Sequence, residues 1–218
     1  MVHGVSNLAR WAALCFLLAV AVPALADDGP YAEGPSPQLL ERIESWLEAL
    51  PGATPAGREA IVGHLVRVGP PAWPLLEAAV DSPEYETAEG AIRALGASGD
   101  PRAADLLAAA AGDRKRFLNL RVEAIQALGR EGRAVAARSL GEIALGGQPE
   151  LRLAAVRALG RTSAREGVDA LLAVAAEDRS LREEALEALE AGTGQRFGDN
   201  LEKWQRWWRI ERWTFAED

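Results

Sequence analysis

The stretch Leu120-Arg121-Val122-Glu123-Ala124-Ile125-Gln126-Ala127-Leu128-Gly129 decides the fold, because closely similar stretches return along the chain. Full copies occupy residues 151–160 and 181–190, and a truncated copy occupies residues 91–96. The four copies end at residues 96, 129, 160 and 190, so the steps between them are 33, 31 and 30 residues. Self-similarity at such a period is typical of repeat proteins in which each repeat stacks on its neighbours.

Helix start signals recur along the rest of the chain and divide it into helices. Four pairs place a capping side chain before a proline, as the first turn of a helix prefers: Ser36-Pro37, Thr54-Pro55, Ser82-Pro83 and Asp100-Pro101. Apolar residues between these marks keep helical spacing, and no useful length alternates with period two. We therefore predict no strands and about eleven helices, at 38–50, 55–68, 72–80, 83–96, 101–111, 115–129, 133–145, 149–160, 164–177, 181–191 and 200–212.

Each repeat is predicted to be a pair of antiparallel helices joined by a short loop. The first helix of each pair, called the A helix, carries a copy of the ten-residue stretch, which we call the phrase. The second, called the B helix, follows it. Ala124 and Ala127 permit close approach of neighbouring helices, and the glycine that ends the phrase suits a left-handed helix C-cap. In the last copy Glu190 takes the place of that glycine and Gly192 follows, so we expect this helix to run on slightly.

Three arginines, Arg121, Arg152 and Arg182, stand at the second position of the full copies. They recur because the repeat recurs, so we interpret them as structural residues rather than as a binding site. Each is expected to reach a neighbouring carboxylate or the end of a helix.

The N-terminal residues 1–26 have the pattern of a secretory signal peptide. Arg10 precedes an apolar run over 11–22, and Ala24-Leu25-Ala26 provides small residues for cleavage after Ala26. Twelve apolar residues fall short of the ~20 that a membrane-spanning helix needs. We expect export to the periplasm or the medium, with no stable membrane insertion after cleavage. Residues 27–37 follow as a polar, flexible leader.

The composition favours a soluble repeat domain over residues 38–218. The chain has a net charge of −8, and removal of a segment with Arg10 and no acid leaves −9. Such an acidic surface disfavours nucleic acid and anionic lipid as general partners. Cleavage would also remove Cys15, the only cysteine, so packing alone must stabilise the fold.

The phrase Leu-Arg-x-x-Ala-φ-x-Ala-Leu-Gly resembles HEAT repeats, in particular the short HEAT-like repeats first described in phycobilisome lyases. The resemblance covers about residues 55–191 and is best over 83–191, with a degenerate first copy that ends at Gly69 and has His64 where alanine is usual. It implies an all-α, right-handed α-solenoid of about five helix pairs. In this family the B helices line the concave face, so the candidate partner-binding residues are Glu77, Asp105, Arg138, Glu142, Asp169 and Glu177.

The C-terminal segment 200–218 is rich in tryptophan. Trp204, Trp207 and Trp208 share one arc of a helix, with basic residues between them. Together with Thr193-Gly194-Gln195-Arg196-Phe197-Gly198, it resembles the closing segment of exported bacterial HEAT-repeat proteins. We interpret the helix as an end cap that covers the last repeat, with Phe197 beside it. A basic helix on a membrane surface is the alternative.

Catalytic chemistry finds little support in these residues. His64 is the only histidine after residue 26, so the paired His and Glu ligands of HEAT-repeat iron hydroxylases, a zinc site and a Ser-His-Asp triad are all lacking. The acidic charge also argues against the DNA-binding mode of HEAT-like glycosylases. We expect no catalytic residue, no metal and no cofactor, and we interpret the chain as an exported scaffold that binds another protein. A chromophore-lyase-like or other ligand-handling role is the alternative.

Overall fold

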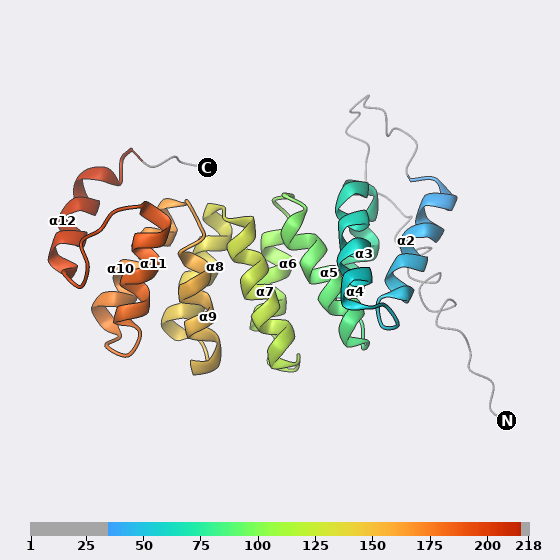
Figure 1. Cartoon of the computed structure of the whole chain (residues 1–218), viewed down its shortest axis with the longest axis horizontal. Helices are drawn as coiled ribbons and strands as arrows, with labels where there is room; N and C mark the ends of the chain where they lie inside the picture. Colours follow the sequence, from blue (N-terminus) through green and yellow to red (C-terminus); the bar gives the residue numbers. More distant parts are fainter. Residues whose placement is uncertain (1–34, 215–218) are drawn as a thin grey trace, which may run out of the picture. The chain divides into compact units, whose positions relative to one another are not determined.

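The computed structural model describes residues 35–214 (Figure 1). The predicted signal peptide, most of the predicted leader and the last four residues lie outside the described residues. Residues 35–214 form eleven α-helices and one short 3-10 helix, without a strand. The helices are α2 (Pro37–Ala49), α3 (Pro55–Val68), η1 (Pro70–Ala72), α4 (Trp73–Val80), α5 (Tyr85–Ala97), α6 (Ala103–Gly112), α7 (Leu118–Glu131), α8 (Ala134–Gly146), α9 (Pro149–Leu159), α10 (Arg165–Glu177), α11 (Arg182–Thr193) and α12 (Leu201–Glu211). Every predicted helix is present within three residues of its expected bounds.

The helices pack as a stack of A–B pairs. The A helices α3, α5, α7, α9 and α11 each contact the next A helix, and the B helices contact one another from α6 to α8 to α10. Each B helix from α4 to α10 also packs on the following A helix. Apolar residues from these helices form one continuous core. This arrangement is an α-solenoid, as the sequence period predicts.

The prediction that the phrase glycines are left-handed C-caps is wrong. Gly96 and Gly129 lie inside α5 and α7, and Gly160 follows α9 with a φ of −63°. The left-handed cap of α7 is instead Gly132, three residues beyond the phrase, with a φ of 75°. The extension predicted for the last A helix is confirmed, because α11 runs to Thr193 before a cap at Gly194.

Close packing between A helices explains the phrase glycines. A Cβ atom on any of them would lie 2.5–3.0 Å from the Cβ atom of an alanine in the next A helix: Ala127 for Gly96, Ala158 for Gly129 and Ala188 for Gly160. Real Cβ atoms do not approach closer than 3.0 Å, so the spacing at Gly96 and Gly129 requires glycine, and the 3.0 Å contact at Gly160 is at this limit. The glycine of one repeat and the alanine of the next therefore form the contact that sets the distance between repeats.

The recurring arginines hold the ends of the B helices, which confirms their structural interpretation. The Nε atoms of Arg121, Arg152 and Arg182 donate to backbone carbonyls in the last turns of α6, α8 and α10, at 2.8, 2.9 and 2.6 Å. These carbonyls have no partner within their own helix. A terminal guanidinium nitrogen of Arg121 donates to Oε1 of Gln148 at 2.5 Å, and one of Arg152 forms an ion pair with Asp178. Each arginine thus ties one repeat to the next.

The last helix, α12, packs on α10 with its tryptophans turned inward. Trp204 is fully buried, and its Nε1 atom donates to the carbonyl of Gly198 at 3.1 Å. Trp208 is also buried, and the ring of Phe197 packs edge-on against Trp204 with centroids 5.0 Å apart. Trp213 is 74% exposed. This is the arrangement that an end cap requires.

Candidate interaction surface

The predicted partner-binding residues all lie on the B helices. Glu77 is on α4, Asp105 on α6, Arg138 and Glu142 on α8, and Asp169 and Glu177 on α10. Five of the six are exposed and Asp169 is half-buried. The apolar positions of the same helices point to the core, so the polar residues mark the outward side of each B helix. We call this side the B-helix face.

Two of the six residues are engaged within the protein. Arg138 forms an ion pair with Glu166 of the next B helix, at 3.1 Å. Asp169 accepts a hydrogen bond from Nε1 of Trp208 at 2.6 Å and pairs with Arg212 at 3.2 Å. Asp169 therefore anchors α12 to α10, a structural role that the sequence analysis did not foresee.

The other four residues are carboxylates, one on each B helix: Glu77, Asp105, Glu142 and Glu177. None of them forms an ion pair with another residue of the described chain, whereas Arg102 pairs with Asp100 and Arg138 with Glu166. These four side chains add negative charge to the B-helix face. A partner that brings cationic groups would complement it.

Two apolar side chains accompany these carboxylates on α8. Val135 and Leu145 are each 40% exposed and share a helix face with Arg138 and Glu142, at spacings of three, four and three residues. The repeat pattern of the sequence did not single them out. The buried residues of α8 include Ala136, Leu140 and Ala144, and Val135 and Leu145 lie on a different face of the helix. That difference is the signal in the sequence that could have revealed them.

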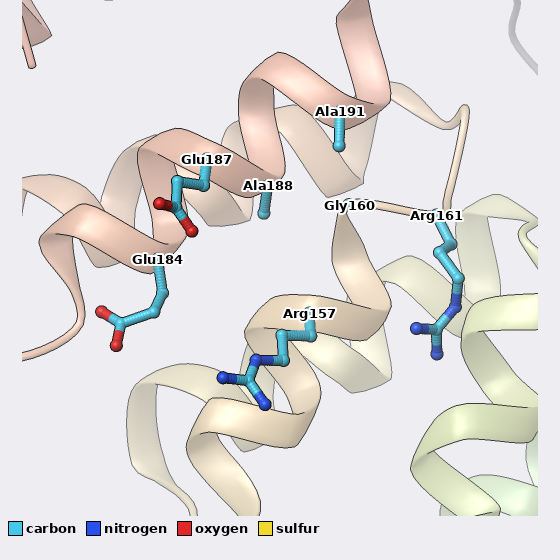
Figure 2. Close-up of a pocket in the computed structure, with 7 residues that line it drawn as sticks. All are labelled: Arg157, Gly160, Arg161, Glu184, Glu187, Ala188 and Ala191. Carbon is cyan, nitrogen blue, oxygen red and sulfur yellow. The ribbon is translucent and has the colours of Figure 1, made fainter. Parts of the chain in front are cut away.

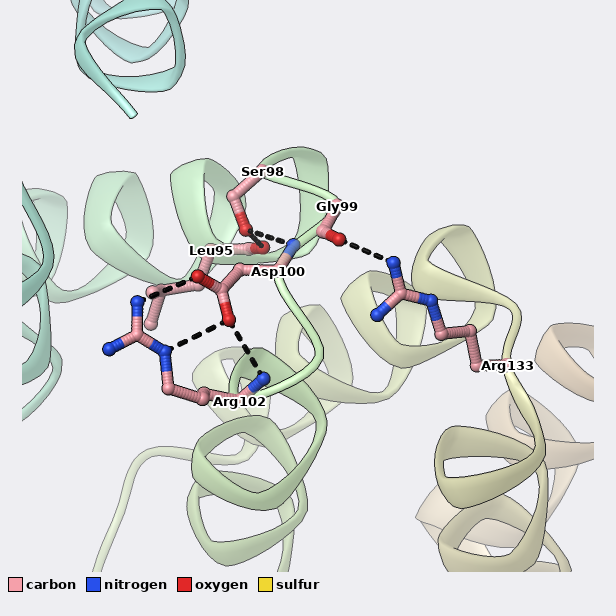
Figure 3. A network of polar contacts seen from close by, with 6 residues as sticks. All are labelled: Leu95, Ser98, Gly99, Asp100, Arg102 and Arg133. Atoms are coloured by element: carbon pink, nitrogen blue, oxygen red, sulfur yellow. Dashed lines mark hydrogen bonds and ion pairs between the residues drawn. The ribbon is translucent and has the colours of Figure 1, made fainter. Parts of the chain in front are cut away.

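A polar network orders the loop between α5 and α6 at the edge of this face (Figure 3). Arg102 donates from its backbone and side-chain nitrogens to the Asp100 carboxylate at 2.7–3.0 Å. The side-chain hydrogen bond from Arg102 is the main cause that lowers the pKa of Asp100. Arg133, ahead of α8, donates to the carbonyl of Gly99 at 2.5 Å. The network fixes the start of α6 and links it to the next repeat.

The candidate chemical sites are few in the part of the chain that the structure describes. Across residues 35–214, no three His, Cys, Asp or Glu side chains are grouped so that they could hold a metal ion. The ring of His64 stacks on Trp46 with centroids 5.0 Å apart and hydrogen-bonds Arg67 through Nδ1. A search of the described helices finds none long and apolar enough to cross a membrane.

Two overlapping stretches of the chain, residues 43–129 and 74–146, match the family model of HEAT repeats. No curated protein matches the chain. The match covers residues 43–146, a little under half of the chain, and it agrees with the stacked helix pairs of the α-solenoid. HEAT repeats commonly serve as scaffolds for protein interactions.

Proposed function

We propose that the chain is an exported, non-catalytic scaffold that binds another protein on its B-helix face. The observation that supports this most is the set of four carboxylates outside ion pairs, one per B helix, on a face that also exposes Val135 and Leu145 of α8. A repeated surface of this kind suits broad, shallow contact, in which a few side chains set the affinity.

The charge of the face suggests the chemistry of the partner. Cationic side chains would meet Glu77, Asp105, Glu142 and Glu177, while an apolar side chain would cover the exposed part of α8. Export rests on the pattern of residues 1–26, and a non-catalytic role rests on the scarcity of residues able to do chemistry.

Affinity purification of the tagged protein from the exported fraction tests this proposal. The test variant changes Glu77, Asp105, Glu142 and Glu177 to the corresponding amides. The matched control neutralises four exposed carboxylates elsewhere: Glu41, Glu48, Glu183 and Glu202. We expect one set of proteins to co-purify with the wild type and the control but not with the test variant. Equal recovery with both variants would refute the B-helix face as the binding surface.

A membrane surface is the second candidate, supported by the outer side of α12. Ile210 is 66% exposed and Trp213 74% exposed, next to the exposed Lys203, Arg206 and Arg209. Such a mixture suits anionic lipid headgroups. Flotation with anionic vesicles, compared between the wild type and an Ile210→Ser, Trp213→Ser variant, tests it. The membrane proposal requires that only the wild type floats.

A further inference from the structure

A groove lies on the other side of the stack, between the A helices α9 and α11. It has a volume of about 220 Å³, and its walls carry charges of opposite sign (Figure 2). Arg157 and Arg161 come from α9 and the residues that follow it, and Glu184 and Glu187 come from α11. Gly160 and Ala188 line it where the two helices approach most closely.

The equivalent position two repeats earlier is closed by ion pairs. Arg93 on α5 pairs with Glu123 on α7 at 4.0 Å, and Glu123 also pairs with Arg130 at 2.9 Å. Arg157 occupies the phrase position of Arg93, and Glu184 occupies that of Glu123. The same two side-chain types therefore meet between α5 and α7 but stand apart between α9 and α11.

The oppositely charged side chains of the groove do not form ion pairs with one another in the described chain. None of Arg157, Arg161, Glu184 and Glu187 forms an ion pair with a residue in the range 35–214. The guanidinium of Arg161 lies 3.5 Å from the carbonyl of Gln126. Burial by nearby atoms, with a further contribution from Arg130, lowers the pKa of Arg161.

The helix contact below the groove fixes its width. A Cβ atom on Gly160 would lie 3.0 Å from the Cα, Cβ and carbonyl oxygen atoms of Ala188, so the two backbones are already in contact there. These small residues fill little space, and the longer charged side chains stand on either side of them. The groove is thus a consequence of the glycine–alanine contact that the repeat requires.

We propose that this groove binds a small zwitterion, a molecule that carries both a carboxylate and an ammonium group. The carboxylate would lie against Arg157, because a guanidinium matches it with paired N–H donors. The ammonium group would lie between Glu184 and Glu187. The volume is below the ~300–1,000 Å³ of drug-sized sites, so the ligand is of amino-acid size. This site is separate from the B-helix face and goes beyond the scaffold function.

Titration of the ¹⁵N-labelled protein with glycine, β-alanine and 4-aminobutyrate, followed by NMR, tests the site. The three probes hold the same two charges at increasing separation. We expect saturable shifts of the amides near Gly160 and Ala188 with at least one probe, and a Kd on the order of 1 mM, as an open, hydrated site allows. Acetate and methylammonium, with one charge each, should bind at least about tenfold more weakly.

Two variants give the matched comparison. Arg157→Gln should weaken binding about tenfold or more, whereas Arg93→Gln, at the equivalent position of an earlier repeat, should leave it unchanged. Absence of a saturable shift at about 50 mM, roughly fifty times the expected Kd, would overturn the proposal. Equal binding of acetate alone would overturn it too.

Two further experiments test other partners for the charged side chains of the groove: a helical peptide, and the side chains of the groove themselves. A helical alanine-based peptide with Glu and Lys one turn apart presents the same chemistry from a protein. If the peptide binds and the free zwitterions do not, the small-molecule proposal is wrong and the groove is a protein contact. Thermal unfolding of Arg157→Gln, Glu184→Gln and the double variant tests direct pairing. Additive effects are expected, and a clear coupling would show that the two residues close the groove themselves.

Discussion

Substitution of Gly96 by alanine tests whether glycine–alanine contacts set the repeat spacing. A Cβ atom at this position would lie 2.5 Å from Cβ and 2.9 Å from Cα of Ala127. Backbone atoms cannot rotate away, so α5 and α7 must move apart. Overpacking of this kind costs about 1–3 kcal/mol, and the better helix propensity of alanine offsets up to about 1 kcal/mol. We expect a net loss of about 1–2 kcal/mol in the free energy of unfolding.

Gly63 provides the matched control for this substitution. It lies inside α3, and a Cβ atom there would meet nothing within 4 Å. Gly63→Ala should therefore stabilise the protein by about 0.5–1 kcal/mol through helix propensity alone. The same chemical change should thus have opposite signs at the two positions.

Urea unfolding followed by circular dichroism at the helix minimum measures both variants. Thermal scans should agree, with the melting temperature lowered by about 2–8 °C for Gly96→Ala and raised by about 1–4 °C for Gly63→Ala. If Gly96→Ala stabilises the protein as much as Gly63→Ala does, the glycine is not a packing requirement and the explanation of the repeat is wrong.

Three further predictions concern the buried and capped residues. Arg121→Gln should cost about 2–3 kcal/mol, because the buried guanidinium satisfies a helix end, while the more exposed Arg182→Gln should cost about 1 kcal/mol; urea midpoints compare them. Leu128→Asp, at a fully buried position, should cost about 4 kcal/mol or more, and a loss below about 1 kcal/mol would show that the stacking is misread. Asp100 has a pKa lowered from its usual 3.8 mainly by a hydrogen bond from Arg102, so its contribution to stability is complete above pH 3.8 and is lost as the pH falls through the lowered value. Melting temperatures of the wild type and Asp100→Asn should therefore differ near neutral pH and converge in acid, and a difference that persists in acid would contradict the assignment.

Local sequence signals were sufficient to place the helices. Ser36 and Thr54 cap α2 and α3 by accepting hydrogen bonds from backbone N–H groups, as their positions before proline indicate. The caps predicted at Ser82 and Asp100 are wrong, because α5 begins at Tyr85 and α6 at Ala103 without a side-chain cap. The period of the phrase was likewise enough to predict a stack. Both signals act over a few residues or repeat along the chain, so they need no knowledge of tertiary contacts.

The structural roles of individual residues depend on tertiary contacts, which cannot be inferred from the sequence alone. A glycine at the end of a phrase is compatible with a left-handed cap and with close packing, and only the position of Ala127 shows that Gly96 serves the second. The sequence indicates only that Asp169 is a carboxylate on a B helix, whereas the structure shows that it accepts a hydrogen bond from Trp208 of α12. Arg93 and Arg157 are equivalent in sequence, yet of the two only Arg93 forms an ion pair within the described residues.

The repeated residues of the phrase therefore account for the stack, and the proposed function depends on residues that differ between repeats. Gly96, Gly129 and Gly160 contact the neighbouring A helix and have no side chain to offer a partner. Val135 and Leu145 are particular to α8 and remain exposed after the core is filled. They are consequently the best reporters of a bound protein.

Hydroxyl-radical footprinting of the protein, alone and with a partner captured by affinity purification, tests the central claim most directly. Oxidation of Val135 and Leu145 should fall on binding, because the proposed contact covers this part of α8. Phe117 and Leu118, which are 67% and 44% exposed at the start of the A helix α7, should keep their reactivity. Protection of Phe117 and Leu118 with unchanged labelling of Val135 and Leu145 would contradict binding on the B-helix face.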